Sequence, residues 1–132
     1  MIGAISEAIR RMTNLEDFRI VTWGLPSSCN LKPLWHAAWS TFGPKLKRVA
    51  ICANLAGHQD LINSNPCLSS VQRFELEFSD DLRSKAPRDR TAEDAFLKDD
   101  LVPFVNRLGP YIKTFKIRSW SKMDLSPFFR FL

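Results

Sequence analysis

Four short segments of the chain repeat one spacing of apolar residues. Each segment has apolar residues at relative positions 1, 4 and 6. The step of two between the last two positions is the alternation of a β-strand. The four apolar sets are Leu15, Phe18 and Ile20; Leu46, Val49 and Ile51; Val71, Phe74 and Leu76; and Ile112, Phe115 and Ile117. Strands favour the β-branched and aromatic residues that dominate these positions. The pattern therefore predicts four short strands, each entered through a packed apolar residue.

Stripes of apolar residues at helical spacing precede three of these strands. Steps of three and four residues predict amphipathic helices before the first, second and fourth strands. The stripes are Ile2, Ile5, Ile9 and Met12; Leu31, Leu34, Trp35, Ala38, Trp39 and Phe42; and Phe96, Leu97, Leu101, Phe104, Val105 and Leu108. Gly43-Pro44 and Gly109-Pro110 predict the ends of the last two of these helices.

The other linking stretches carry weaker helical patterns. Residues 58–70 contain Pro66 and predict only a short helix or a turn before the third strand. Residues 123–132 predict the start of a further helix, with Pro127 in its first turn. Helices and strands should therefore alternate along the whole chain.

A charged insertion separates the third strand from the helix that follows it. The stretch from Asp80 to Asp100 holds twelve charged residues in twenty-one, and its first part, 80–90, predicts a solvated surface loop. Thr91 is the predicted N-cap of the next helix, with Asp94 three residues further on.

Charged residues alternate with the apolar residues of all four predicted strands. One face of the sheet should therefore meet water, whereas strands of a doubly wound sheet are buried on both faces. We expect an α/β fold, a short leucine-rich-repeat-like solenoid with parallel strands on one face and helices on the other. It should form a single domain, 1–132, incomplete at its end, with units at about 1–25, 26–57, 58–79 and 91–122, and the start of another at 123–132.

The repeated segments resemble irregular leucine-rich repeats, whose pattern is L-x-x-L-x-L-x-x-N-x-L. The first unit fills it with Leu15, Phe18, Ile20, Trp23 and Leu25, and the second with Leu46, Val49, Ile51 and Asn54. Trp23 and Trp120 replace the asparagine in the first and fourth units, and Ala56 takes the last apolar position of the second. The segments NLEDFRI, KLKRVAI and YIKTFKI, with helices that end near Gly-Pro, are similar to the repeat region of fungal F-box-like proteins. That resemblance implies the substrate-recognition part of an F-box-type ubiquitin-ligase receptor, although no F-box segment is visible in this chain.

Composition narrows the class of protein. The chain of 132 residues is 45% hydrophobic and 25% charged, which argues against disorder. Its net charge of +5 falls short of a dedicated nucleic-acid binder. Three cysteines fit a reducing compartment, and no apolar run is long enough to span a membrane. We expect an intracellular protein, cytoplasmic or nuclear.

The wet face of the predicted sheet is the candidate site. Its charged residues are Asp17, Arg19, Arg48, Arg73, Glu75, Glu77, Lys116 and Arg118. Its central row should read Arg19, Ala50, Glu75 and Lys116. A mixed-sign face with arginines suits a charged peptide or protein surface. The alternative is a face that is simply solvated, with some cross-strand pairing.

Other chemistry-bearing residues favour ordinary structural roles. Trp23, Trp35, Trp39, Phe78 and Trp120 are expected in the core. The two histidines are expected at the surface, and the spacing of His36, His58, Cys29, Cys52 and Cys67 matches no zinc site. Cys52 is expected on the open face, without a base to activate it. The pairs Asp80-Asp81 and Asp99-Asp100 are expected in the solvated loop, where they suit solubility rather than acid–base catalysis.

These observations favour a non-catalytic module that recognises a protein partner through the strand face. We expect no cofactor, no metal, no membrane contact and no small-molecule substrate. Among the basic clusters, aromatic residues interleave only in Lys113-Lys116-Arg118, through Phe115 and Trp120. Phe115 is expected in the core and cannot stack on a base, which argues against nucleic acid. The alternative is a small globular α/β domain with a nucleic-acid-binding or unassigned enzymatic role.

Overall fold

The computed structural model describes residues 2–12, 14–22, 31–64, 66–79, 89–119 and 123–131. Its strands are β1 Asp17–Val21, β2 Arg48–Ala53, β3 Arg73–Phe78 and β4 Thr114–Ser119. Its α-helices are α1 Ile2–Arg10, α2 Lys32–Phe42, α3 Leu55–Asn63, α4 Arg90–Ala95, α5 Val102–Leu108 and α6 Ser126–Phe131. A 3₁₀ turn, Gly43–Lys45, follows α2, and a π-helical segment, Phe96–Leu101, joins α4 to α5. All four predicted strands are confirmed.

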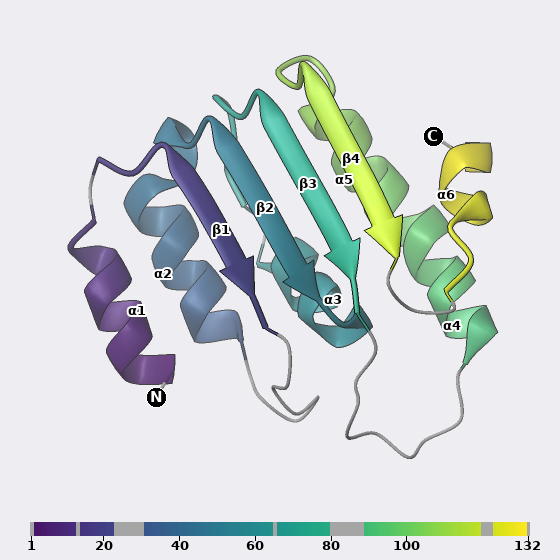
Figure 1. The fold of residues 1–132 in the computed structure, drawn as a ribbon, viewed down its shortest axis with the longest axis horizontal. Coiled ribbons are helices and arrows are strands. Elements are labelled where there is room, and N and C mark those ends of the chain that lie inside the picture. The colour runs from purple at the N-terminus through teal and green to yellow at the C-terminus, as the bar shows by residue number, and fades with distance from the viewer. Residues whose placement is uncertain are drawn as a thin grey trace.

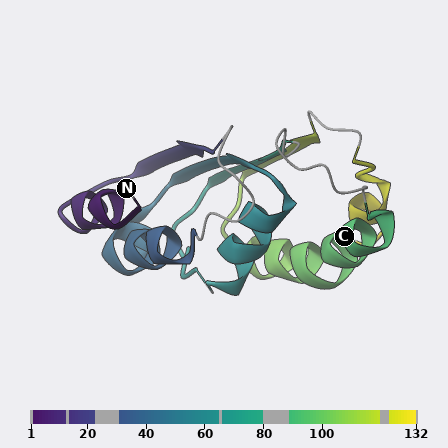
Figure 2. The same cartoon turned by 90° about the horizontal axis from the view of Figure 1, so that it is seen from below.

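The four strands form one parallel sheet in the order β1-β2-β3-β4 (Figure 1). Each strand pairs with the next along the chain, and the sheet stays open rather than closing into a barrel. The helices lie on one side of the sheet, as the view along its edge shows (Figure 2). The fold is therefore α/β, with one helix-covered face and one face that no described helix covers. We call the second the strand face.

The core lies between the sheet and the helices. Alternate strand residues point into it and are buried, among them Val49, Ile51, Phe74 and Leu76. From the helix layer come Trp35, Trp39, Phe42, Phe96, Leu97, Leu101 and Phe104, all buried. The rings of Trp35 and Trp39 stack with centroids 5.7 Å apart. The predicted core positions of Trp35, Trp39 and Phe78 are confirmed, whereas Trp23 and Trp120 lie outside the described residues.

The first helix packs less completely than its apolar stripe suggests. Ile9 is buried, but Ile5 and Met12 are exposed, with 40% and 48% of their surface accessible. Ser6 is buried instead. Helix α1 lies at the edge of the molecule, packed against α2, so only one narrow side of it faces a neighbour (Figure 2). The predicted amphipathic helix is therefore confirmed, although Ile5 and Met12 of its apolar stripe lie outside the core.

The helix before β3 begins earlier than expected. Helix α3 starts at Leu55 because Asn54 is its N-cap, with a side-chain oxygen that accepts from the Gly57 backbone N–H at 2.9 Å. The repeat pattern assigns Asn54 to its asparagine position. A short helix or turn is predicted only within 58–70. The helix ends at Asn63, ahead of Pro66.

The N-cap of the helix after the charged insertion is also corrected. Helix α4 begins at Arg90, and the carboxylate of Asp89, not Thr91, accepts from the Ala92 backbone N–H at 3.0 Å. Asp89 keeps the extended backbone typical of a cap, whereas Thr91 already lies inside the helix. Residues 80–88 of the expected insertion lie outside the described residues.

The predicted helix ends after the apolar stripes are confirmed. Helix α2 stops at Phe42, before Gly43-Pro44, and α5 stops at Leu108, before Gly109-Pro110. Both glycines keep right-handed backbone angles, so neither is needed for a left-handed turn. Gly43 allows a close approach instead, since a Cβ there would lie 3.0 Å from the carbonyl oxygen of Cys67.

Candidate interaction surface

Register turns the strand alternation into three rows of side chains across the strand face. The first row is Asp17, Arg48, Arg73 and Thr114. The second row is Arg19, Ala50, Glu75 and Lys116. The third row is Val21, Cys52, Glu77 and Arg118. The predicted central row is confirmed, and all eight charged residues predicted for the candidate site lie in these rows.

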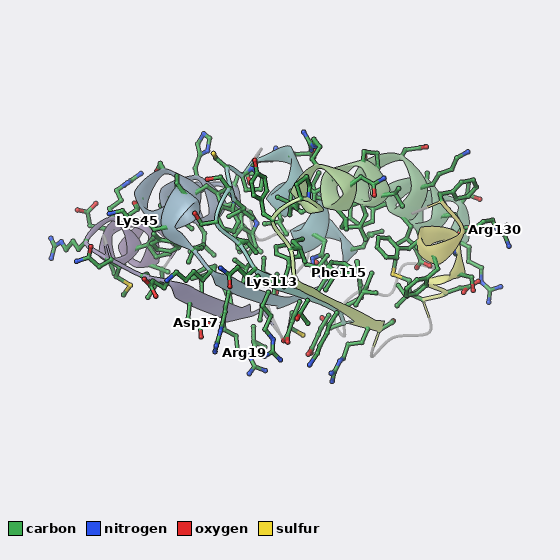
Figure 3. The ribbon with its side chains drawn as sticks, turned by 90° about the horizontal axis from the view of Figure 1, so that it is seen from above. Asp17, Arg19, Lys45, Lys113, Phe115 and Arg130 are labelled. Carbon is green, nitrogen blue, oxygen red and sulfur yellow. The ribbon has the colours of Figure 1, made fainter. Side chains whose placement is uncertain are left out.

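These side chains project away from the helix layer. Figure 3 shows Asp17 and Arg19 on the side of the sheet opposite the helices. Asp17, Arg19 and Arg48 are exposed, whereas Glu75 and Glu77 are partly buried between their neighbours. Strands in a sheet lie about 4.8 Å apart, so side chains in one row contact one another directly. Charged side chains therefore lie next to one another in each of the three rows.

Ion pairs hold the acidic side chains of β3. The Glu75 carboxylate accepts from Arg73 Nε at 2.9 Å and lies 3.7 Å from Lys116 Nζ. Glu77 Oε1 lies 3.8 Å from Arg118 Nε. These pairs are partly exposed, so each stabilises the fold by at most about 1 kcal/mol. Their main effect is to fix the arrangement of charge on the β3–β4 half of the face.

The electrostatics of Glu75 follow from this arrangement. Partial burial of the carboxyl raises its pKa, but the Arg73 hydrogen bond and charge, together with the Lys116 charge, outweigh that effect. The net result is a pKa below the ordinary value for glutamate. Glu75 is therefore ionised at neutral pH and already engaged by two cations.

The β1–β2 half of the face is organised differently. The described residues offer no ion pair to Arg19 or to Arg48, although both side chains are exposed. Ala50 is the register partner of Arg19 and lies two residues after Arg48 on β2. Its small side chain leaves space between the longer side chains of the second row. A depression of about 200 Å³ results, lined by Asp17, Arg19, Arg48, Val49, Ala50, Arg73 and Glu75. The sequence pattern named the charged residues but missed this depression, for which the small Ala50 in a row of long side chains was the available signal.

The third row is the most apolar part of the face. Val21 is half exposed, with 51% of its surface accessible, and Cys52 is buried between its neighbours. Cys52 lies on the strand face, as predicted, and Cys67 is an exposed free thiol before β3. Among the described residues no cluster of histidine, cysteine and carboxylate side chains could hold a metal ion.

Two other expectations for chemistry-bearing residues are wrong. His58 is fully buried rather than at the surface, with its ring against Phe78 and its Nε2 donating to the Glu77 carbonyl at 2.9 Å. Burial lowers the pKa of His58 to about 4, although the Glu77 hydrogen bond partly opposes that shift. The neutral imidazole therefore anchors α3 to the end of β3. Asp99 and Asp100 lie on the π-helical segment instead of in a loop.

Comparison of the chain with protein-family models, with curated proteins and with solved structures finds no match. None of the described helices is long and apolar enough to cross a membrane. Inference about function therefore rests on the strand face itself.

Proposed function

We propose that the chain is a non-catalytic module that recognises a partner protein through the strand face. The observation that carries this proposal is the set of eight charged side chains in three aligned rows, on a face that no described helix covers. Charged rows with an unfilled depression suit the polar, complementary contacts of a protein interface. Two arginines of this face, Arg19 and Arg48, have no ion pair among the described residues and are available to a partner.

The architecture further supports a leucine-rich-repeat-like solenoid. The strands follow sequence order, with each crossover on the same side of the sheet. Solenoids bind partners through the extended surface that such a stack presents. A compact α/β domain with a nucleic-acid-binding or enzymatic role, the alternative reading, would be expected to have helices over both faces.

The resemblance to F-box-like repeat regions extends the proposal by one step. A substrate-recognition part of a ubiquitin-ligase receptor would use the strand face to hold the protein that is to be modified. Such a role implies the cytoplasm or nucleus, in keeping with the exposed free thiol of Cys67.

Selection of random dodecapeptides displayed on phage tests the recognition role. Peptides enriched on the chain should bind the Ala50→Leu variant at least about tenfold more weakly, because leucine fills the depression. Asn106→Leu is the matched control, since it adds a leucine to the exposed surface of α5, and it should leave binding unchanged. Enriched peptides that bind both variants as well as the parent chain would place recognition elsewhere and overturn the proposal.

A further inference from the structure

Charge on the strand face is unevenly satisfied. The face carries five cationic and three acidic side chains, an excess of two positive charges. Glu75 is held by Arg73 and Lys116, and Glu77 is held by Arg118. The acidic residues of β3 are therefore committed to β3 and β4, and Arg19 and Arg48 are left without an ion pair among the described residues.

Arg19 and Arg48 lie beside the same depression. They occupy neighbouring strands, one row apart, with Ala50 in line with Arg19 and directly after Val49. Each guanidinium presents several N–H donors in a planar fork that matches the two oxygens of a carboxylate. Three arginines and two carboxylates line the depression, which has room for an acidic side chain and carries a net positive charge.

We infer that this depression binds a carboxylate side chain within an acidic segment of the partner protein, with Arg19 and Arg48 as its ligands. This inference rests on the proposed function, because it names the chemistry of the partner that the strand face would recognise. Charge complementarity selects the occupant: a basic segment would be repelled by the two arginines, and a neutral one would leave them unpaired.

The surrounding acidic residues favour a protein segment over a nucleic acid. Asp17 and Glu75 line the depression, and Glu77 lies one row beyond Glu75. A nucleic acid carries a phosphate at every nucleotide, so phosphates next to a bound one would meet these carboxylates. An acidic side chain flanked by neutral residues brings only its own single charge near Asp17 and Glu75, and Arg19 and Arg48 offset that repulsion. The positive site is limited in extent, as a single carboxylate requires.

Fluorescence anisotropy with a defined probe tests the inference. The probe is a fluorescein-labelled dodecapeptide that alternates aspartate with serine, compared with its asparagine-for-aspartate counterpart and with a twelve-nucleotide single-stranded DNA. The parent chain should bind the acidic peptide best. The double variant Arg19→Gln and Arg48→Gln should bind it at least about tenfold more weakly, since charge-assisted hydrogen bonds are lost.

A matched control separates this site from general attraction to a basic protein. The pair Arg90→Gln and Arg130→Gln removes the same charge from exposed positions on α4 and α6, and it should leave affinity within about twofold. Figure 3 shows Arg130 well apart from Arg19. Glu75→Gln should strengthen binding severalfold, because it removes a carboxylate that lines the depression and repels the bound one.

The outcomes distinguish this inference from the proposed function. No binding of the acidic peptide, equal weakening by both arginine pairs, or tighter binding of the DNA through Arg19 and Arg48 would each overturn the inference. If phage-selected peptides need an unfilled Ala50 position but ignore the two arginines, the partner is not acidic and the recognition role stands. If no selected peptide depends on the strand face, the recognition role itself fails.

Discussion

At the scale of single residues, one buried histidine links the two layers of the molecule. His58 donates through Nε2 to the Glu77 carbonyl, while its Nδ1 has no hydrogen-bond partner among the described residues. A proton on Nδ1 would be buried without an acceptor, in keeping with the pKa of about 4. Glu77 therefore contacts α3 through its backbone carbonyl, which accepts from His58, and β4 through its carboxylate, which pairs with Arg118.

This histidine should make the fold sensitive to mild acid. Below the ordinary histidine pKa of 6.5, His58 of the unfolded chain binds a proton, whereas the folded protein keeps His58 neutral down to its pKa of about 4. Stability therefore falls as pH drops through this window, by about 3 kcal/mol in total. Urea unfolding at pH 7, 5.5 and 4 should show this loss relative to His58→Gln, which keeps a donor but cannot titrate. Parallel losses in both proteins would contradict the buried neutral imidazole.

At the scale of elements, helix starts depend on which residue offers its side chain at the first turn. Asp89 caps α4, whereas Thr91 lies two residues further on, already inside the helix. Asp89→Ala should therefore lower the free energy of unfolding by about 1 kcal/mol. Thr91→Ala should change it by less than about 0.5 kcal/mol, because alanine suits an exposed helix interior. Equal losses in thermal denaturation of the two variants would count against this assignment.

The packing of α3 on β2 requires a glycine. A Cβ at Gly57 would lie 2.8 Å from the Cβ of Ala53, which is fully buried on β2. Gly57→Ala should therefore destabilise the fold by about 1 to 3 kcal/mol despite its better helix propensity. The control is Gly3→Ala in α1, where no atom lies within 4 Å, and it should stabilise by about 0.5 kcal/mol. A neutral Gly57→Ala would show that α3 can shift away from the sheet.

Elements with a local signal were predictable, and those set by tertiary contacts were not. The strands followed from period-two alternation, and the three rows followed from the strands because parallel pairing aligned equivalent residues. The start of α3 was missed because Asn54 suits both a repeat position and an N-cap. The exposure of Ile5 depends on how many neighbours α1 has, and the burial of His58 depends on a contact with β3. Neither the exposure of Ile5 nor the burial of His58 can be predicted from the neighbouring residues in the sequence.

At the scale of the whole molecule, the sheet is best packed in its middle. Phe74 and Leu76 of β3 are buried, whereas the equivalent Phe115 and Ile117 of β4 are only partly buried. The outer edges of β1 and β4 pair with no described strand. Amide hydrogen exchange should therefore be slowest in β2 and β3 and faster in β1 and β4. Exchange in β4 as slow as in β2 would mean that its edge is covered in solution.

The open, charged face is the feature that ties the fold to the proposed function. The helix layer covers one side of the sheet, and no described helix covers the three rows of side chains on the other side (Figure 2). Within those rows, pairing on β3 and β4 leaves positive charge concentrated near Ala50. The proposed function thus depends on an open sheet face whose described residues include a depression lined by Arg19 and Arg48.

Nuclear magnetic resonance of the arginine side chains tests this claim most directly. The Nε–Hε signals of the ¹⁵N-labelled chain would be followed while the aspartate–serine dodecapeptide is added. We expect saturable shifts of the Arg19 and Arg48 signals, and no shift of the Arg90, Arg107 and Arg130 signals. Shifts spread evenly over all five arginines, or absent from Arg19 and Arg48, would contradict recognition of an acidic partner at the strand face.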